Sequence, residues 1–340
     1  MRLTTEAALK IFSEGDLLDL ARRADDIRKK KFGDTVTFII DRNINYTNIC
    51  VNECKFCAFF RRANQRGAYL LTHEEILRKV RETVEAGGTQ LMIQGGLHPD
   101  LELEWYEQML RLIKKNFDIT IHSFTATEIL HFAKRAGLSV LEVLKRLQAA
   151  GLDSLPGGGA EILVDDIRRR ISPKKIMTDD WLNVMRAAHS IGMKSTATMV
   201  IGFGETLEQR LDHMKKIRDL QDETGGFRAF ITWTYQPLNT ALGGTKVTAQ
   251  DYMRTLAMTR IFLDNVAHIQ GSWVTQGERI GQLTLAFGAD DLGSIMLEEN
   301  VVRAAGTSFE MSTRKMVELI RAAGRIPAQR NTTYDVLKIF

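Results

Sequence analysis

Three cysteines within eight residues are the part of this sequence most able to do chemistry. Cys50, Cys54 and Cys57 lie in the stretch CVNECKFC and are the only cysteines of the 340-residue chain. A disulfide needs thiols in pairs, and a closed structural zinc site needs four ligands. The nearest histidines, His73 and His98, do not stand at the spacing that is usual in short zinc motifs. The trio therefore fits neither kind of site well.

The same three thiolates would suit an iron–sulfur cluster. A [4Fe–4S] cluster normally takes four cysteine ligands, and this chain supplies three. One iron would then be open to a small molecule, and the amino and carboxylate groups of S-adenosylmethionine can chelate such an iron. If the trio binds iron, we therefore expect a cluster that binds a cofactor. An iron–sulfur sensor or electron carrier, without that cofactor, is an alternative from another class.

Composition and charge exclude several kinds of protein. Apolar residues make up 44% and charged residues 26%, as in an ordinary globular protein. The formal net charge is only +4, and basic runs such as RRADDIRKKK and RRRISPKK are short and typical of solvated helix faces. We therefore expect no nucleic-acid partner. There is no secretory signal or membrane-length apolar run, and unpaired thiols suit a reducing compartment, so we expect a cytoplasmic protein without membrane insertion.

Short β-rich runs alternate with longer amphipathic helical patterns, which is typical of a parallel sheet with helices around it. The runs lie at 35–41, 89–96, 118–124, 151–159, 195–204, 228–237, 268–274 and 283–289. Eight such strands predict an α/β fold, a (β/α)8 barrel of TIM type, with a doubly wound open sheet as the alternative. We expect residues 1–33 to form an N-terminal helical extension and residues 34–340 the barrel with C-terminal helices.

The informative loops follow predicted strands. CVNECKFC follows the first strand, GGLHPD the second, PGGGAE the fourth and GFGE the fifth. Active sites of TIM-type barrels lie at the C-terminal ends of the strands. The pattern therefore places the cysteines and the glycine-rich loops together at one mouth of the barrel.

The spacing C-x3-C-x-aromatic-C, filled here by Cys50, Cys54, Phe56 and Cys57, resembles the cluster motif of the radical S-adenosylmethionine (radical SAM) enzymes. The resemblance implies a radical SAM barrel with a [4Fe–4S] cluster on the three cysteines and bound S-adenosyl-L-methionine. It further implies a small-molecule substrate and an external electron donor such as flavodoxin or ferredoxin. In these enzymes the reduced cluster cleaves the cofactor to methionine and a 5′-deoxyadenosyl radical.

The same resemblance implies a set of cofactor-binding residues. These are Phe56, Gly95, Gly96, Glu161, Arg168, Val200 and Gly202. Gly95 and Gly96 would let the backbone approach the methionine amino group, although Leu97 stands where the family often has an acid. Glu161 would contact the ribose or the amino-acid part. Arg168 would hold the carboxylate, unless it is a helix-surface arginine.

Longer stretches narrow the resemblance to the futalosine branch of menaquinone biosynthesis. ILVDDIRRRISPKK, WTYQPLNT and GSWVTQGERIGQLTLAFGADDLGSIMLEENVV look like the dehypoxanthine futalosine cyclase family. That family implies abstraction of the C4′ hydrogen of the substrate's ribose by the 5′-deoxyadenosyl radical, followed by attack on a benzoate ring. The sister family, aminofutalosine synthase, shares the cluster loop and PGGGAEI, and its adenosyl radical adds to an enolpyruvyl benzoate.

Such a cyclase also needs a base and residues that bind the benzoate group. Candidates for the base, all near predicted strand ends, are His122, Glu161, Tyr235 and Asp290. For each of them a structural hydrogen bond is the competing role, because buried polar groups are usually paired. The aromatic residues that could stack on the ring, or simply pack inside the barrel, are Trp233, Tyr235 and Trp273. The benzoate carboxylate requires a donor from an arginine, an asparagine or a backbone amide.

Overall fold

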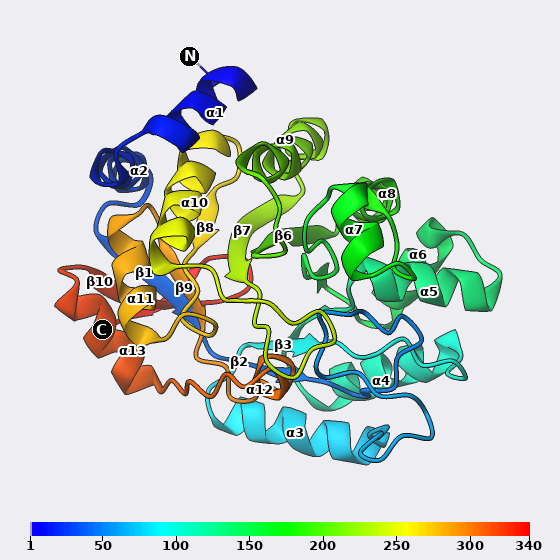
Figure 1. The fold of residues 1–340 in the computed structure, drawn as a ribbon. Coiled ribbons are helices and arrows are strands. Elements are labelled where there is room, and N and C mark those ends of the chain that lie inside the picture. The colour runs from blue at the N-terminus through cyan, green and yellow to red at the C-terminus, as the bar shows by residue number, and fades with distance from the viewer. Residues whose placement is uncertain (1) are drawn as a thin grey trace.

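A curled sheet of eleven strands occupies the centre of the molecule, and helices pack around its outside (Figure 1). The computed structural model describes residues 2–340. The strands are β1 Thr35–Ile39, β2 Asp41–Ile44, β3 Gln90–Ile93, β4 Thr120–Ser123, β5 Ser154–Leu155, β6 Lys194–Ile201, β7 Phe227–Thr234, β8 His268–Gln270, β9 Asp291–Ser294, β10 Ile326–Arg330 and β11 Val336–Ile339. Only β10 and β11 pair antiparallel, and every other pair among the described strands is parallel.

One extended segment, residues 35–44, closes the sheet into a barrel. Its first half, β1, pairs with β9 and β10, and its second half, β2, pairs with β3. The chain after β9 continues along the same segment, because the N–H of Leu297 donates to the carbonyl of Asp41 and the N–H of Asn43 donates to that of Glu298. The series of paired strands from β2 to β9 therefore starts and ends on the same segment, residues 35–44, and the barrel is closed. The predicted (β/α)8 barrel of TIM type is confirmed, and the open sheet is not formed.

The prediction of an eighth strand at 283–289 is wrong. These residues end α11 Glu278–Leu283 and form a 3-10 turn, Thr284–Ala286, so that Leu285 is buried and Leu283 is exposed. The eighth barrel strand is β9, whose Asp291 and glycine did not resemble a strand. Asp291 is buried because Arg330 of β10 pairs with it. An alternating apolar pattern of seven residues fits a helical turn as well as a strand, and here the turn forms.

The helices follow the expected alternation with the strands. They are α1 Thr5–Glu14, α2 Leu17–Phe32, α3 His73–Glu85, α4 Leu103–Asn116, α5 Ala126–Ala136, α6 Val140–Ala150, α7 Asp165–Ile171, α8 Thr178–Ser190, α9 Leu207–Thr224, α10 Ala249–Phe262, α12 Val301–Ala304 and α13 Thr313–Ala322, besides α11. Capping boxes begin α3, α5, α6 and α9, at Thr72, Thr125, Ser139 and Thr206. These side chains satisfy backbone N–H groups that would otherwise lack partners.

The two ends of the chain both lie against the barrel. Helices α1 and α2, dark blue in Figure 1, pack on α9 and α10. The last residue of α2, Phe32, stacks on His268 at the start of β8, so α2 reaches the N-terminal ends of the strands. After α13, strand β10 pairs with β1 and β11 forms the outer edge of the sheet. Within residues 2–340 no helix is long and apolar enough to span a membrane.

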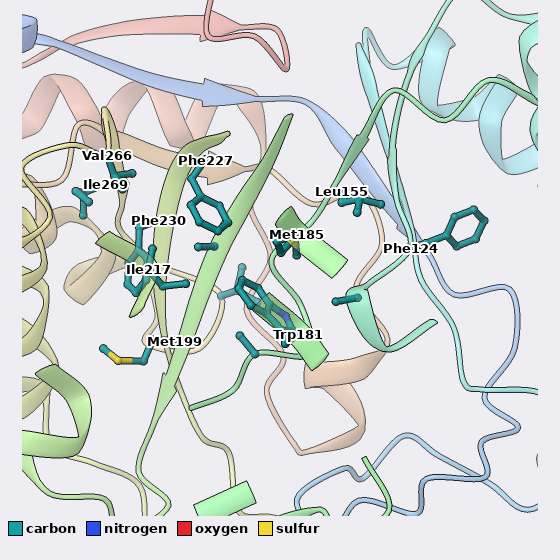
Figure 2. Close-up of a cluster of buried hydrophobic side chains, with 14 of the residues drawn as sticks. Phe124, Leu155, Trp181, Met185, Met199, Ile217, Phe227, Phe230, Val266 and Ile269 are labelled. Atoms are coloured by element: carbon teal, nitrogen blue, oxygen red, sulfur yellow. The ribbon is translucent and has the colours of Figure 1, made fainter. Parts of the chain in front are cut away.

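The main hydrophobic core lies between the strands and the surrounding helices. Figure 2 shows part of it, where Trp181 of α8 and Ile217 of α9 meet Met199, Phe227 and Phe230 of the sheet. The rings of Trp181 and Phe227 are stacked, with centroids 6.2 Å apart. This packing fixes the outer surface of the strands, and so it fixes which side chains point into the barrel.

Candidate active site

A cavity of about 430 Å³ fills the inside of the barrel and joins the cysteine loop to the strand interiors. Most of the residues singled out in the sequence line it. These are Cys50, Cys54, Phe56, Cys57, Gly95, Gly96, His122, Glu161, Val200, Trp233 and Tyr235. Four do not line it: Arg168, Gly202, Trp273 and Asp290. The structure therefore gathers the cysteines and the predicted loops in one chamber and leaves four candidates behind its walls.

The cysteine loop is held in place by segments that are distant in sequence. The backbone N–H of Cys50 donates to the carbonyl of Arg61, 3.1 Å away, and that of Lys55 donates to Ile171, 2.9 Å away. In turn Leu242 donates to the carbonyl of Lys55. These bonds tie the loop to α7 and to the chain that follows β7. The positions of the thiols are thus set by tertiary contacts.

Gly95 and Gly96, after β3, lie against the start of the cysteine loop and against Tyr46, which precedes that loop. A Cβ atom on Gly96 would lie 2.2 Å from the carbonyl oxygen of Ile49, and one on Gly95 would lie 2.5 Å from the ring of Tyr46. No side chain fits in either place. The glycines are therefore required by the chain's own packing, and their predicted contact with the cofactor stays a prediction.

A buried carboxylate, which the sequence reasoning missed, positions this glycine loop. Oε1 of Glu128 accepts hydrogen bonds from the N–H of Gly95 at 3.0 Å and from the hydroxyl of Tyr46 at 2.8 Å. Burial raises the pKa of Glu128 above its ordinary value. In the sequence Glu128 is only the third residue of a capped helix, and nothing there indicates its second contact.

Glu161 and Lys175 form a buried ion pair in the cavity wall. Nζ of Lys175 donates to Oε1 of Glu161 at 2.6 Å and lies 5.4 Å from the centre of the Phe56 ring. Burial by itself would lower the pKa of Lys175, but the charge of Glu161 outweighs it and holds the pKa above its usual value. Oε2 of Glu161 is buried, accepts no hydrogen bond from residues 2–340 and lies 3.6 Å from a guanidinium nitrogen of Arg168. The wall thus offers a cation beside a carboxylate oxygen that still has hydrogen-bonding capacity.

Lys175 was also missed by the sequence reasoning. It belongs to the run RRRISPKK, which reads as a solvated charged face, and its neighbour Lys174 does have an exposed side chain. Only the fold turns Lys175 inward. Glu161 itself has a positive φ of 38°, in the region that non-glycine residues rarely adopt. The backbone conformation that aims this carboxylate inward is therefore strained, as is frequent at functional sites.

Arg168 lies behind the PGGG loop and not in the cavity. Its guanidinium is fully buried and donates to the carbonyls of Gly159, Ala160 and Ile176. Trp181 supports the same loop, since its Nε1 donates to the carbonyl of Gly158 at 3.2 Å. The arginine is thus engaged in shaping the loop that carries Glu161. Its predicted contact with a cofactor carboxylate stays a prediction.

The other base candidates have structural partners. Nδ1 of His122 lies 2.7 Å from Oγ of Ser154, and burial lowers the pKa of His122 to about 3, so the ring is neutral. The hydroxyl of Tyr235 donates to the carbonyl of Gly243 at 3.1 Å, which anchors the loop after β7. Of these two, His122 reaches deepest into the barrel, since it lies on β4. Their catalytic roles stay predictions.

Asp290 and Gly202 lie outside the cavity, and each has partners in the protein. Asp290 pairs with Arg260 and accepts from Nδ1 of His268 at 2.6 Å. The N–H of Gly202 donates to Oε1 of Glu205 at 2.9 Å. Both contacts are internal to the chain. Their assigned roles as base and cofactor ligand therefore stay predictions.

The two tryptophans that were candidates for stacking are in different environments. Trp233, on β7, is half-buried and lines the cavity. Trp273 is buried outside the cavity, and its Nε1 donates to the carbonyl of Ser294 at 2.9 Å. Only Trp233 presents surface to the cavity.

The donor set at the mouth fits an iron–sulfur cluster. All three thiols line one cavity, and the chain holds no disulfide among them. Within residues 2–340 no three His, Cys, Asp or Glu side chains converge as they would on a single metal ion. A [4Fe–4S] cluster does not require that convergence, because each thiolate binds a different iron. Glu161 and Lys175 line the same cavity as the three thiols, and this pair offers partners for an amino acid's ammonium and carboxylate groups.

Comparison with known proteins decides the family. Residues 44–217 match the model of the radical SAM superfamily, and residues 224–340 match the model of the CofH/MqnC C-terminal region. The chain belongs to the radical SAM superfamily. Radical SAM enzymes use a [4Fe–4S] cluster and S-adenosylmethionine, so both predicted cofactors are confirmed. Cys50, Cys54 and Cys57 as the ligands of the cluster stay a prediction.

Three curated relatives match this radical SAM enzyme along its whole length. The cyclic dehypoxanthine futalosine synthase of Streptomyces coelicolor is 50% identical, over 99% of this chain and 86% of its own. The protein of the same name from Halalkalibacterium halodurans is 47% identical, over 100% of this chain and 92% of its own. The aminodeoxyfutalosine synthase of Thermus thermophilus is less similar, at 39% identity over 100% of this chain and 93% of its own.

Solved structures resemble the radical SAM barrel described here. The FeFe-hydrogenase maturase HydG of Carboxydothermus hydrogenoformans superposes with a TM-score of 0.79 over 98% of this chain and 77% of its own, at 18% identity. Methylornithine synthase superposes with a TM-score of 0.76 over 96% of this chain and 95% of its own, at 19% identity. At these identities the likeness shows the fold alone.

Proposed function

We propose that this radical SAM enzyme converts dehypoxanthine futalosine to cyclic dehypoxanthine futalosine, in the futalosine pathway of menaquinone biosynthesis. The observation that carries the proposal is one continuous cavity, with three thiols and an ion pair at its mouth and polar strand residues deeper inside. Cofactor and substrate can lie end to end in such a chamber. The choice of substrate is supported by the two full-length relatives at 50% and 47% identity.

The chain's own residues divide the cavity into two parts. At the mouth, Phe56 and Val200 give apolar contact for an adenine, while Lys175 and Glu161 suit an amino acid's carboxylate and ammonium. When bound, the cluster and S-adenosylmethionine supply the 5′-deoxyadenosyl radical that removes the C4′ hydrogen of the substrate's ribose. The deeper part must then hold sugar and benzoate ring close together.

The deeper part is suited to that task. Ile231 of β7 forms apolar wall, Trp233 lies above it at the level of Val200, and Gln90 and Gln270 present amide groups from β3 and β8. Amides can bond to ribose hydroxyls, and an aromatic wall can stack on an arene. The surrounding barrel keeps bulk water away from a carbon radical, which would otherwise be quenched. The residues of the chain thus orient the two reacting groups.

The decisive experiment is an anaerobic reaction of the reconstituted protein with S-adenosylmethionine, a strong reductant and dehypoxanthine futalosine, followed by mass spectrometry. A cyclised product with stoichiometric 5′-deoxyadenosine is expected. The sister reaction would be recognised because an enolpyruvyl benzoate would then be consumed and the adenosyl group incorporated into the product. Slow, substrate-independent formation of 5′-deoxyadenosine alone would contradict the assigned substrate.

A flavodoxin or a ferredoxin is proposed as the electron donor. Part of the cysteine loop lies at the surface, where Val51, Lys55 and Arg66 are exposed. Basic side chains around a cluster suit docking of an acidic electron carrier. Charge reversal of Lys55 and Arg66 should slow reduction by flavodoxin and leave reduction by dithionite unchanged. We place the protein in the cytoplasm, because its three free thiols require a reducing compartment.

A further inference from the structure

A β-bulge turns one arginine of β7 into the barrel. Ser195 pairs with Phe227 and the next residue, Thr196, pairs with Ala229, so Arg228 is an extra residue in the ladder. Bulges of this kind redirect side chains and are frequent next to active sites. The side chain of Arg228 lines the cavity, whereas Phe227 packs in the outer core shown in Figure 2.

The guanidinium of Arg228 has no partner within residues 2–340. Only burial and the more distant charges around it act on its pKa, and burial, the largest effect, lowers that pKa. The two carboxylates whose charges act on the pKa of Arg228 are engaged elsewhere: Asp153 accepts from Nζ of Lys114 at 2.6 Å, and Asp335 accepts from Nδ2 of Asn331 at 2.9 Å. A partly buried arginine without a counter-ion is costly, unless a ligand supplies the negative charge.

The surroundings of Arg228 favour an anion. Arg330 lies close enough to lower the pKa of Arg228, but its own guanidinium is committed to Asp291 and to the carbonyl of Asn331. His122, which also faces this part of the cavity, is neutral. Arg330 therefore has its own counter-ion, whereas Arg228 has none within residues 2–340. Of the two arginines, Arg228 is the one that is available to a ligand.

We propose that Arg228 binds the benzoate carboxylate of the substrate, an inference that rests on the proposed function. Arg228 lies five residues below Trp233 on β7, which at the rise of a strand is about 17 Å. The thiols lie beyond the other end of that span, at the C-terminal mouth. A substrate held by its acid at Arg228 thus extends its ribose toward the cofactor. The planar guanidinium suits a carboxylate because it can donate two parallel hydrogen bonds.

The test uses the reconstituted holoenzyme with S-adenosylmethionine and two substrates, dehypoxanthine futalosine and its benzamide analogue. Wild-type enzyme should bind the acid better than the amide. Arg228→Gln should raise KM for the acid by about 10- to 100-fold, as expected for the loss of a charged hydrogen bond, with little change for the amide. Arg228→Lys should fall between. Arg321→Gln, at an exposed arginine of α13, serves as the matched control and should change neither KM.

Two results would overturn the assignment of Arg228. One is a wild-type enzyme that binds acid and amide equally well, a measurement that does not depend on any variant folding. The other is an Arg228→Gln enzyme whose KM changes equally, or not at all, for both substrates. If wild-type enzyme turns over neither substrate while still cleaving S-adenosylmethionine slowly, the proposed function itself fails, and the Arg228 assignment fails with it. The readouts therefore distinguish the two failures.

Discussion

Lys175 donates a 2.6 Å hydrogen bond to Glu161 in the wall of the cavity, and its ammonium lies over the Phe56 ring. The two residues flank α7, Glu161 before it and Lys175 after it, and Arg168 of that helix donates to the carbonyls of Gly159 and Ile176 just outside the pair. One short helix therefore brings an ammonium, a carboxylate and an aromatic face together beside the cysteines. This arrangement matches the charges of an amino-acid cofactor better than either residue alone.

Lys175→Met should weaken S-adenosylmethionine binding about tenfold or more, because one charge-assisted hydrogen bond is removed. Equilibrium dialysis with the cluster-loaded protein measures this directly. Lys174→Met is the matched control, since its side chain is 57% exposed and should leave the affinity unchanged. Equal affinities for the two variants would show that Lys175 only supports Glu161.

Gly96→Ala should prevent the protein from holding its cluster. The added Cβ would lie 2.2 Å from the carbonyl of Ile49, so the cysteine loop must shift. Iron and sulfide content after anaerobic reconstitution, with the visible absorbance of the cluster, reports the loss. Gly137→Ala is the control: it strains a left-handed helix end but meets no atom within 4 Å. A full iron content in Gly96→Ala would show that the loop tolerates the displacement.

Asp290→Asn should destabilise the fold by about 3–5 kcal/mol at neutral pH, because it leaves the buried Arg260 without its counter-ion. Asp166→Asn, at a carboxylate whose side chain is 86% exposed, should have almost no effect. Urea unfolding of the three proteins measures the difference. Loss of activity with unchanged stability would instead support Asp290 as a catalytic base.

The ion pair of Asp290 with Arg260 also makes the stability of the fold depend on pH. Burial would raise the pKa of Asp290, but the hydrogen bond from His268 and the charge of Arg260 outweigh it and hold the pKa below the ordinary value of 3.8. A carboxyl group with a lowered folded-state pKa stabilises the fold fully above its unfolded pKa. That stabilisation is lost as the pH falls through the folded-state value. The difference in unfolding free energy between wild type and Asp290→Asn should therefore become smaller only below about pH 4.

Trp233→Leu should mainly change substrate binding, whereas Trp273→Leu should mainly change stability. Trp233 lines the cavity, so its loss should raise KM for the substrate with a small change in stability. Trp273 is 3% exposed and bonds to Ser294, so its loss should lower the unfolding free energy by about 3–5 kcal/mol. Steady-state kinetics and urea unfolding of both variants test this. Unchanged KM in Trp233→Leu would assign that ring to packing.

The barrel was predictable from the sequence because most of its strands are apolar runs that end in glycine-rich loops. The eighth strand was not, since β9 contains Asp291, whose burial depends on Arg330, a residue 39 positions later. No local pattern records such a pairing. The strands β10 and β11 follow α13 in a region where only helices were expected, and β11 is exposed along its whole length.

Some residues of the site could likewise be predicted from the sequence, and others could not. Cysteine spacing and glycine loops are local signals, and they identified the thiols and most of the cavity mouth. Lys175 looked like one of several surface lysines, and Arg228 looked like an ordinary strand residue. Their positions in the cavity wall depend on a turn of the chain and on a register shift, and both arise only from packing between distant segments.

The segment that closes the barrel also leads directly into the cysteine loop, and this order has a consequence for biogenesis. The cysteines leave the ribosome well before the segments that hold their loop in place. The strands that pair with β1 begin at Asp291 and Ile326, and Lys55 is bonded to Ile171 and Leu242. During translation these partners are made much later. The metal-loading machinery of the cell therefore meets a finished cluster pocket only after β9 and β10 have been synthesised.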